Sequence, residues 1–356
     1  MDFAKAFDRV NHSLLAHKLE HYGIRGNIND WISNFLCKRS QAVVVDGERS
    51  SSVSVRSGVP QGSVLGPCLF LAYINDLPER VSSTSCLFAD DTLLHRLMKE
   101  SKDREIIQED LRNLENWEQE WEMYFHPSKC NILPISKTRN NLDTTEYHLH
   151  NERLETVTSA KYLGVTLQSD MKFDQHIDII CNKANRMLGL LRRNLRSAPK
   201  NTKELGYKAL VRPILEYASS VWDPYEEKDI QKIEKVQRRA ARFVLNQYKQ
   251  TDSVTAMLKD LGWQTLKDRR KKARLCMMYK INSGQVHIKF ERLKKLDKRS
   301  GRRKGNSEMF ERVVCRRNYR NETFLPKTIR EWNELPDDIV QSTSLGSFSL
   351  KVSKML

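Results

Sequence analysis

Residues 86–94 read CLFADDTLL, two apolar runs on either side of the adjacent carboxylates of Asp90 and Asp91. This pattern predicts a β-hairpin that carries the two aspartates at its tip. Two neighbouring anions repel each other, and a tight hairpin turn usually takes Asn-Gly or Asp-Gly instead. A bound divalent cation would offset the repulsion, whereas the simpler interpretation is a solvated polar turn.

Two upstream motifs accompany the hairpin, and the combination is more specific than any of its parts. Residues 2–8 read DFAKAFD, and residues 57–67 read SGVPQGSVLGP. In this order, followed by FADDT, they resemble the reverse transcriptase of non-LTR retrotransposons, close to the CR1 and jockey kind. Residues 73–78 (YINDLP), the pair Lys129-Cys130 and residues 162–165 (YLGV) extend the resemblance over most of the chain.

The spacing of apolar residues predicts an α+β fold. Helical spacing occurs at residues 14–36 and 107–121, and strand-like stretches occur at 41–46, 52–56 and 131–135. This order is typical of a mixed sheet covered on one face. The resemblance implies a right-hand polymerase palm that lacks most of the fingers. We expect this palm over residues 1–168, a helical, basic, thumb-like region over 169–300 and a C-terminal tail region over 301–356.

Three aspartates and a lysine carry the catalysis that the resemblance implies. Asp2, Asp90 and Asp91 match the family's catalytic triad, and we expect them to hold two Mg²⁺ ions, for which Mn²⁺ can substitute. Mg²⁺ takes oxygen ligands, and a pair of ions can activate a primer 3′-hydroxyl and hold the triphosphate. Asp2 and Asp90 are the expected closer ligands. Lys129 matches a lysine that protonates departing pyrophosphate, although His126 stands where the family usually has Asn.

The resemblance also implies contacts to the incoming nucleotide. Phe7 matches the bulky side chain that lies under the sugar and excludes a 2′-hydroxyl, which would favour deoxynucleotides. A core position for Phe7 is the alternative. Pro60, Gln61 and Gly62 match a loop beside the nascent base pair, although glycine-rich loops commonly serve only as turns.

A turn farther along the chain is the expected primer contact. Tyr162, Leu163 and Gly164 match the turn that positions the primer terminus, and a buried strand is the simpler alternative. The partners implied by these positions are an RNA template, a DNA primer or target, and deoxynucleoside triphosphates.

Charge separates the two halves of the chain. Residues 1–150 hold 17 Lys/Arg and 21 Asp/Glu, and residues 151–356 hold 44 and 24, for a total of +16. This division suits a polymerase that collects cations in one part and holds a polyanionic backbone in the other. A basic tail for solubility or nuclear import is the alternative. We expect nucleic acid to contact one amphipathic helix and a second basic stretch, through Lys232, Lys235, Arg239, Arg242, Arg269, Arg270, Lys271 and Lys272.

Composition argues against several classes of protein. The sequence has no run of 18 or more apolar residues and no basic-then-apolar leader, so we expect neither a membrane span nor a secretory signal. The seven cysteines form no CxxC pair and no Cys/His group at zinc spacing, which predicts free thiols and no zinc knuckle. We expect an intracellular protein of the nucleus or of a cytoplasmic ribonucleoprotein.

The position of Asp2 bears on activity. It follows Met1 directly, whereas the family has a strand and a fingers region before this aspartate. An aspartate beside a frayed terminus is poorly held for two-metal geometry, so we expect an N-terminally truncated enzyme with little polymerase activity alone. The alternative is a catalytically inactive, truncated remnant that binds nucleic acid. A group II intron maturase fits less well, because residues 212–218 and 222–225 resemble the tail of the retrotransposon enzymes.

Overall fold

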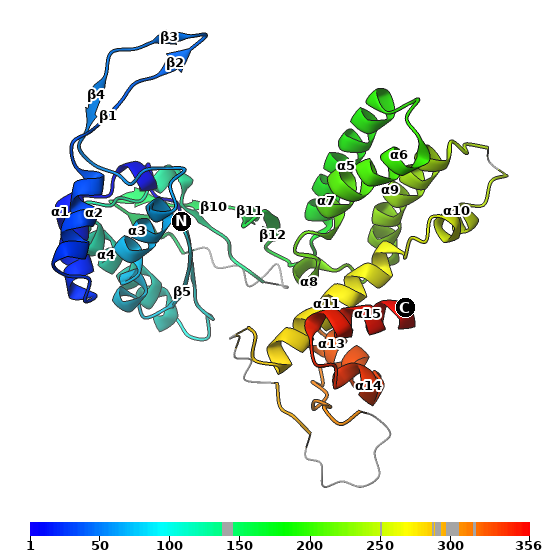
Figure 1. Ribbon diagram of the computed structural model, residues 1–356. Coiled ribbons are helices and arrows are strands. Elements are labelled where there is room, and N and C mark those ends of the chain that lie inside the picture. The colour runs from blue at the N-terminus through cyan, green and yellow to red at the C-terminus, as the bar shows by residue number, and fades with distance from the viewer. Residues whose placement is uncertain (137–144, 250, 287, 289–292, 297–305, 316–317) are drawn as a thin grey trace. The chain divides into compact units, whose positions relative to one another are not determined.

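The computed structural model describes residues 1–356 except 137–144, 250, 287, 289–292, 297–305 and 316–317. Contacts divide the chain into two compact units, Met1–Met171 and Lys172–Leu356. The first unit mixes helices and strands, and the second is helical (Figure 1). The expected boundary at residue 300 lies outside the described residues.

The first unit combines helices with paired strand segments. Its helices are η1 (Ala6–Asp8), α1 (His12–His21), α2 (Asn27–Leu36), α3 (Leu65–Ile74), η2 (Leu77–Arg80), α4 (Lys102–Trp121) and η3 (Pro127–Lys129). Its strands are β1 (Arg39–Gln41), β2 (Val44–Val45), β3 (Glu48–Arg49), β4 (Val53–Val55), β5 (Thr84–Phe88), β6 (Asp91–His95), β7 (Asn131–Ile132), β8 (His148–Leu149), β9 (Glu152–Arg153), β10 (Glu155–Thr156), β11 (Ser159–Tyr162) and β12 (Val165–Gln168). In the described part of the unit they form six two-stranded sheets, where the sequence predicts one mixed sheet.

Single-residue bridges connect the N-terminal segment to two neighbours. β5 and β6 pair antiparallel with Phe88 opposite Asp91, which confirms the predicted hairpin. Asp2 bridges Asp91 on one side of the segment, and Phe3 bridges Phe125 on the other. These contacts are too short to count as strands. They nevertheless hold the first motif between the hairpin and the segment that follows α4.

The core of the first unit lies along α4. The predicted apolar stripe of this helix is buried at Leu111, Leu114, Trp117 and Trp121. Phe3 stacks on Phe125 with ring centroids 4.1 Å apart, and the backbone N–H of Phe125 donates to the buried carboxylate of Glu118 at 2.5 Å. α4 therefore fixes the segment around Phe125, and this segment packs against the first motif.

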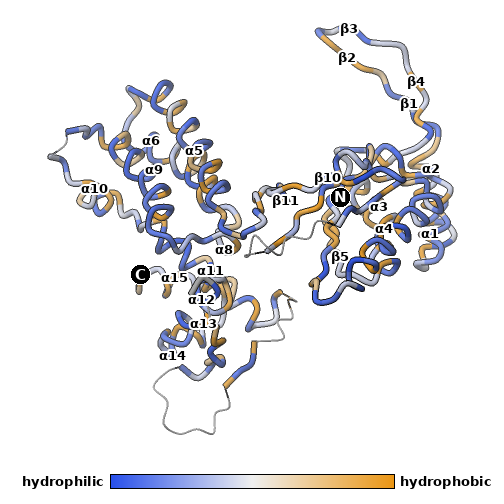
Figure 2. Tube along the Cα trace, turned by 180° about the vertical axis from the view of Figure 1, so that it is seen from behind, coloured by the Kyte–Doolittle hydropathy of each residue, from blue (hydrophilic) through white to orange (hydrophobic). Residues whose placement is uncertain are grey.

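A long hairpin arm extends from the first unit, away from helices α1–α3 (Figure 1). The strands predicted at residues 41–46 and 52–56 are present in it as the shorter pairs β1–β4 and β2–β3. Figure 2 shows hydrophobic residues along β2, and Val44 and Val45 are 63% and 62% exposed. The strand pattern of residues 41–46 and 52–56 thus forms paired strands here, but neither face of the hairpin arm is buried.

The second unit is built from helices. They are α5 (Asp174–Asn194), α6 (Lys200–Gly206), the π-helical η5 (Tyr207–Val211), α7 (Arg212–Glu216), α8 (Ser219–Trp222), α9 (Glu227–Leu245), α10 (Val254–Asp260), α11 (Leu266–Asn282), α12 (Asn318–Asn321), α13 (Phe324–Asn333), α14 (Asp337–Val340) and α15 (Leu345–Met355). The predicted apolar stripe of α9 is buried at Ile230, Ile233, Val236, Ala240, Phe243 and Val244. A separate core joins α11, α13 and α15 through Met278, Trp332 and Phe348. Among the described helices of either unit, none is both long and apolar enough to cross a membrane.

Candidate active site

The three predicted catalytic aspartates lie on neighbouring segments of the first unit. Asp91 begins β6, and Asp90 lies in the turn just before it. Asp2 faces Asp91 across the antiparallel bridge, so the two side chains leave their segments on the same side. Hydrogen bonds from Met1 N to Thr92 O at 2.7 Å and from Thr92 N to Met1 O at 3.1 Å hold this bridge.

The facing carboxylates of Asp2 and Asp91 fit the chemistry of Mg²⁺, which usually takes one or two protein carboxylates together with substrate phosphates and waters. No group of three or more His, Cys, Asp or Glu side chains in the described residues is placed to hold a metal ion. The residue that bridges Asp2 is Asp91, and the resemblance implies that Asp2 and Asp90 are the closer metal ligands. The order of the two hairpin aspartates around a metal stays a prediction.

Lys129 lies beside Asp2. Its Nζ is 3.3 Å from Oδ2 of Asp2, and its side chain is 56% exposed. The loop that carries it is fixed through the backbone, because His126 N donates to Asp2 O at 2.9 Å. The His126 ring contacts Oγ of Ser128 at 2.9 Å and is not needed for this backbone bond. The histidine therefore leaves Lys129 next to the first motif.

The glycine-rich loop is fastened to the first motif by backbone hydrogen bonds. Gly58 N donates to Val10 O, and Val59 N donates to Phe7 O, both at 2.8 Å. Gly58 has a φ of 86°, and a Cβ there would lie 2.8 Å from backbone atoms of Phe7 and Asp8. Both the conformation and the space at this position require glycine.

Side chains strengthen the same attachment. Gln61 Nε2 donates to Oδ1 of Asp8 at 3.2 Å. The carbonyl oxygen of Gly58 lies 2.8 Å from Nε2 of His12 and accepts from Nη2 of Arg39 at 3.0 Å. Sequence reasoning missed His12 and Arg39, because both lie outside the recognisable motifs and nothing in their spacing marks them.

Phe7 and the loop residues border the same part of the unit. Phe7 is half-buried and stacks on Phe70 of α3, with ring centroids 4.5 Å apart. Pro60 is half-buried, and Gln61 and Gly62 are exposed. Phe7 thus packs one face on the core, as the core interpretation requires, and keeps part of its surface accessible.

The predicted primer contact forms a hairpin turn instead of a buried strand. Tyr162 ends β11, and Leu163 and Gly164 connect it to β12 with φ angles of 44° and 80°. Burial raises the pKa of the Tyr162 hydroxyl, and the nearby Cys86 and Asp91 raise it further. The Tyr162 hydroxyl is therefore within electrostatic reach of the Asp-Asp hairpin.

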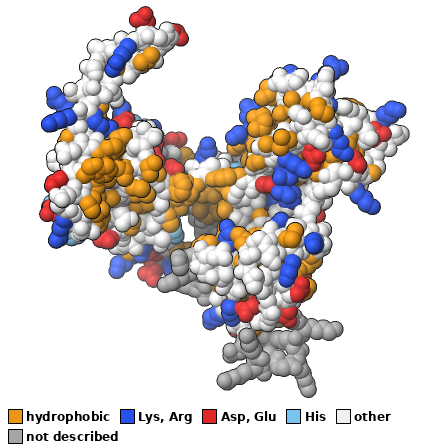
Figure 3. Space-filling model, in the orientation of Figure 1, with side chains coloured by type: hydrophobic (Ala, Val, Ile, Leu, Met, Phe, Trp, Pro, Cys, Tyr) orange, Lys and Arg blue, Asp and Glu red, His pale blue; other side chains and the backbone are white. Residues whose placement is uncertain are grey.

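Four of the expected nucleic-acid contacts lie outside the buried stripe of α9: Lys232, Lys235, Arg239 and Arg242. Lys232 pairs with Asp178 at 2.8 Å, and Nη1 of Arg239 donates to Oδ1 of Asn185 at 3.1 Å. These partners come from α5 and hold the cations at the surface. Figure 3 shows blue basic side chains on the visible face of the second unit, interspersed with hydrophobic and acidic ones.

The expected contacts on α11 need a correction. Arg270 is only 1% exposed, and its Nε donates to Oδ1 of Asp223 at 2.7 Å, so it cannot lie on a surface that meets a nucleic-acid backbone. Arg269, Lys271 and Lys272 are half-buried. The basic run is therefore split, because a buried anion holds part of it inside the unit.

Asp223 is the centre of a buried ion cluster. It accepts hydrogen bonds from Arg274, which lies beside Arg270 on α11, and from Nζ of Lys327 on α13 at 2.9 Å. Burial would raise the pKa of Asp223, but Arg274, Lys327 and Arg270 together hold it below its ordinary value. Nη2 of Arg274 also reaches Glu331 at 2.7 Å. The cluster ties α11 to α13, and no local pattern in the sequence could have indicated it.

Comparison with known proteins finds a family match for the first unit. Residues 1–167 match the family described as reverse transcriptase (RNA-dependent DNA polymerase). The match includes the first motif, the glycine-rich loop, the Asp-Asp hairpin and the β11–β12 turn.

Relatives from mobile elements cover more of the chain. The RNA-directed DNA polymerase from mobile element jockey of Drosophila melanogaster is 28% identical over 68% of this chain and 27% of its own length. The probable RNA-directed DNA polymerase from transposon X-element of the same species is 27% identical over 68% of this chain and 28% of its own. The chain spans about a quarter of the length of these curated relatives. The chain is therefore similar to the reverse transcriptase family through residues 1–167, and over about two thirds of its length it is similar to RNA-directed DNA polymerases from mobile elements.

Proposed function

We propose that the chain provides the palm and a thumb-like part of an RNA-directed DNA polymerase that copies retrotransposon RNA from a DNA primer. The observation that carries this proposal is the bridge between Asp2 and Asp91 at the hairpin, with Lys129 3.3 Å from Asp2. The names of the mobile-element relatives support the same reaction. Such an enzyme would act in the nucleus or in a cytoplasmic ribonucleoprotein.

The proposed catalytic roles follow from the positions of the side chains. Asp2, Asp90 and Asp91 would supply carboxylate oxygens from two adjacent segments to a pair of Mg²⁺ ions. Bound Mg²⁺ would activate the primer 3′-hydroxyl and neutralise charge on the triphosphate. Lys129 shares the space beside Asp2, so its ammonium group can donate a proton to the leaving pyrophosphate.

The proposed nucleotide site lies where the glycine-rich loop is hydrogen-bonded to the first motif. Phe7 is held against Phe70, and the hydrogen bond from Gln61 to Asp8 fixes the loop beside it. Because the Phe7 ring is packed against Phe70, it cannot easily move aside, so it can exclude a 2′-hydroxyl by steric contact. The proposed substrates are therefore deoxynucleoside triphosphates, with an RNA template and a DNA primer.

Templated primer extension in Mg²⁺ tests the proposal. The chain is assayed alone and preceded by upstream residues of its own reading frame, each with and without Asp90→Asn. We expect extension at least in the longer form, and a loss of about 100-fold or more in the variant, because a charge that stabilises the transition state is removed. Asp46→Asn is the matched control, since Asp46 is an exposed carboxylate in the turn of the β2–β3 hairpin. Absence of extension in both forms, or equal loss in both variants, would refute the proposal.

A nucleic-acid-binding protein without catalysis is the second candidate. The exposed cations of α9 favour it, because phosphate contacts need no active site. The two candidates differ in their response to Asp90→Asn. A pure binder keeps its affinity for RNA, or gains some as negative charge is removed, and shows no extension with any variant.

A further inference from the structure

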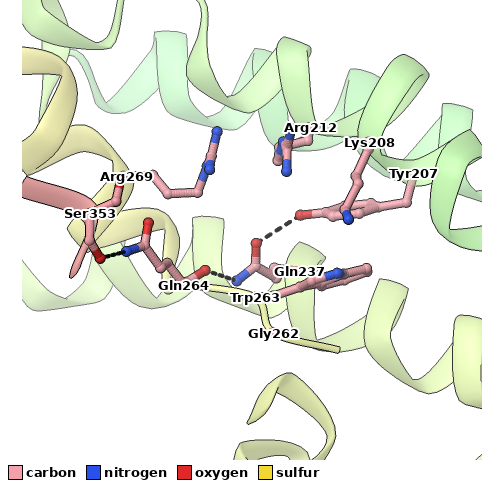
Figure 4. A pocket seen from close by; sticks show the side chains of 9 residues that line it. All are labelled: Tyr207, Lys208, Arg212, Gln237, Gly262, Trp263, Gln264, Arg269 and Ser353. Atoms are coloured by element: carbon pink, nitrogen blue, oxygen red, sulfur yellow. Dashed lines mark hydrogen bonds between the residues drawn. The ribbon is translucent and has the colours of Figure 1, made fainter. Parts of the chain in front are cut away.

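The second unit contains a polar pocket that the proposed polymerase chemistry does not use. Its volume is about 380 Å³, and it is lined by Tyr207, Lys208, Arg212, Gln237, Gly262, Trp263, Gln264, Arg269 and Ser353. Three of these nine lining residues are cations and none is acidic. The volume is within the range of small-ligand sites in proteins. Figure 4 shows how the side chains converge.

An irregular helix forms one wall of the pocket. Residues Tyr207–Val211 are π-helical, between α6 and α7, and Arg212 is the first residue of α7. Insertions of this kind are rare and occur frequently at functional sites, because they turn side chains away from the regular helical positions. Here the irregular turn brings Tyr207, Lys208 and Arg212 to the same pocket.

The cations are held by carboxylates but retain capacity to bind. Lys208 pairs with Glu204 at 2.5 Å, and its side chain is 39% exposed. Arg269 donates Nε and Nη2 to Glu216, which lies 3.7 Å from Nε of Arg212. That buried Nε of Arg212 has no hydrogen-bond partner among the described residues. Glu216 is thus shared by two guanidinium groups, and one buried donor is left for an acceptor.

The opposite side of the pocket is a chain of hydrogen bonds. Tyr207 Oη donates to Oε1 of Gln237 at 2.8 Å, and Nε2 of Gln237 donates to the Gln264 carbonyl at 2.9 Å. Nε2 of Gln264 donates to the Ser353 carbonyl at 2.8 Å. Figure 4 shows this chain across the pocket from Arg212 and Arg269, with Lys208 beside Tyr207. Because its side-chain groups are already engaged, it fixes the shape of the pocket and leaves charge recognition to Lys208, Arg212 and Arg269.

We propose that this pocket binds a phosphate group of a nucleic acid or a nucleotide. Phosphate oxygens accept hydrogen bonds from several cationic donors at once, and arginine and lysine are the residues that proteins use for this purpose. The carboxylates of Glu204 and Glu216 are not among the lining residues, and they orient the cations by pairing with them. The site belongs to the second unit and needs none of the proposed catalytic aspartates.

Anisotropy of a labelled 12-nucleotide single-stranded RNA, measured with the full chain, tests the proposal. We expect Lys208→Gln and Arg212→Gln each to raise the Kd about fivefold or more, and the salt dependence to fall by about 0.7 in slope for each lost phosphate contact. Lys208→Arg retains the charge and should retain the affinity.

Lys200→Gln is the matched control, because Lys200 pairs with Asp260 at 2.9 Å and is 44% exposed but does not line the pocket. We expect this variant to change the Kd less than twofold. If Lys208→Gln and Lys200→Gln weaken binding equally, or neither does, the cations act as diffuse charge and the proposal is overturned. A melting curve for each variant separates lost binding from lost folding.

Competition identifies the source of the phosphate. Unlabelled RNA, dATP and inorganic phosphate are added at equal phosphate concentration. Competition by RNA alone assigns the pocket to a strand, whereas competition by dATP at low concentration assigns it to a nucleotide. Competition by none of the three overturns the proposal. The result does not depend on primer extension, so an inactive polymerase site would leave this test intact.

Discussion

Two groups of acidic side chains, one in each unit, lie in opposite surroundings. Residues 1–171 carry 19 Lys/Arg and 24 Asp/Glu, and residues 172–356 carry 42 and 21. In the first unit, Asp2, Asp90 and Asp91 are exposed or half-buried and are placed by backbone pairing. In the second, the buried carboxylate of Asp223 pairs with three cations, Arg270, Arg274 and Lys327. The proposed metal ligands of the first unit thus stay accessible, whereas Asp223 of the second unit is enclosed by cations of its own unit.

The difference also affects what holds each site together. The first motif and the glycine-rich loop are joined mainly by backbone hydrogen bonds, such as Gly58 N to Val10 O, which are insensitive to side-chain charge. α11 and α13 are joined by the ion cluster around Asp223. Neutralising an aspartate should therefore have opposite consequences for stability in the two units.

Asp223→Asn should give the largest effect. The substitution leaves Arg270, Arg274 and Lys327 without their shared anion, and breaking a buried ion pair in this way costs about 3–5 kcal/mol. Asp90→Asn should leave stability unchanged or slightly higher, because it relieves repulsion between adjacent carboxylates. Denaturant unfolding gives the free energy of unfolding of each variant. Hydrogen exchange measured on individual peptides shows which unit is destabilised. Equal destabilisation by both variants would contradict the comparison.

Gly66→Ala should disrupt the first unit through its backbone. A Cβ at Gly66 would lie 2.3 Å from the Pro60 carbonyl oxygen, so the glycine-rich loop would have to move, at a cost of about 1–3 kcal/mol. Gly346→Ala in α15 is the matched control in the second unit. Its nearest contact would be Oγ of Ser344 at 3.9 Å, so alanine should stabilise the helix by about 0.5–1 kcal/mol. Opposite shifts in melting temperature are expected, and a stabilising Gly66→Ala would show that the loop is loosely held.

Local patterns predicted the elements well. The hairpin at residues 86–94, the stripe of α4 and the stripe of α9 all follow from periodicity, because each depends on residues close in sequence. The prediction that Arg270 in the basic run of α11 contacts nucleic acid was wrong. A run of basic residues usually indicates a solvent-exposed face, and only the position of the paired anion shows that one of them is buried. That anion, Asp223, lies 47 residues away. Lys18 is a similar case, because it is buried between Asp76 and the ring of Trp121, and neither partner is close to it in sequence.

The predicted mixed sheet failed for a different reason. The strand predicted at residues 131–135 pairs only as β7, over Asn131–Ile132, and its partner β10 lies beyond residues 137–144, which are not described. The N-terminal segment contacts its neighbours through isolated bridges at Asp2 and Phe3. Strand propensity gives no information on how far a pairing extends, because that depends on the partner. The motifs, in contrast, located the proposed catalytic side chains, since each motif is short and contiguous.

Acid should affect the stability of the two units in opposite directions. The pKa of Asp223 is lowered by its cations despite burial, so the unfolded chain binds the proton more readily, and stability is lost as pH falls through and below the unfolded value of about 3.9. Burial raises the pKa of Glu118, with hydrogen bonds from Phe125 and His150 offsetting only part of the effect. Its contribution therefore favours the fold at low pH and is lost as pH rises above the unfolded value of about 4.3.

Two variants isolate these contributions. Asp223→Asn should remove part of the acid destabilisation of the second unit, and Glu118→Gln should make the first unit more stable at neutral pH relative to acid. Denaturant unfolding from pH 3 to 7, with exchange by peptide, measures both. The comparison fails if the two variants change the pH dependence in the same direction.

The smallest expected effects come from two alanines in the left-handed region. Ala89 in the Asp-Asp hairpin has a φ of 50°, and Ala218 before α8 has a φ of 51°. A residue with a Cβ costs about 1–2 kcal/mol in this conformation, and glycine removes this strain. The larger loss of chain entropy on folding of glycine offsets about 0.5–1 kcal/mol of the gain. Ala89→Gly and Ala218→Gly should therefore each stabilise the chain by about 0.5–1 kcal/mol in denaturant unfolding.

Their effects on activity should differ. Ala89 adjoins Asp90, and glycine there widens the range of conformations open to the hairpin tip, so primer extension should fall a few-fold despite the gain in stability. Ala218→Gly should leave extension unchanged, because Ala218 adjoins α8 in the second unit, where no proposed catalytic side chain lies. Equal activity of the two variants would mean that the strain at Ala89 is not needed to hold the aspartates. A selective loss would mean that the first unit accepts a strained residue to fix Asp90 and Asp91, in the way that the second unit uses buried charge to fix its helices.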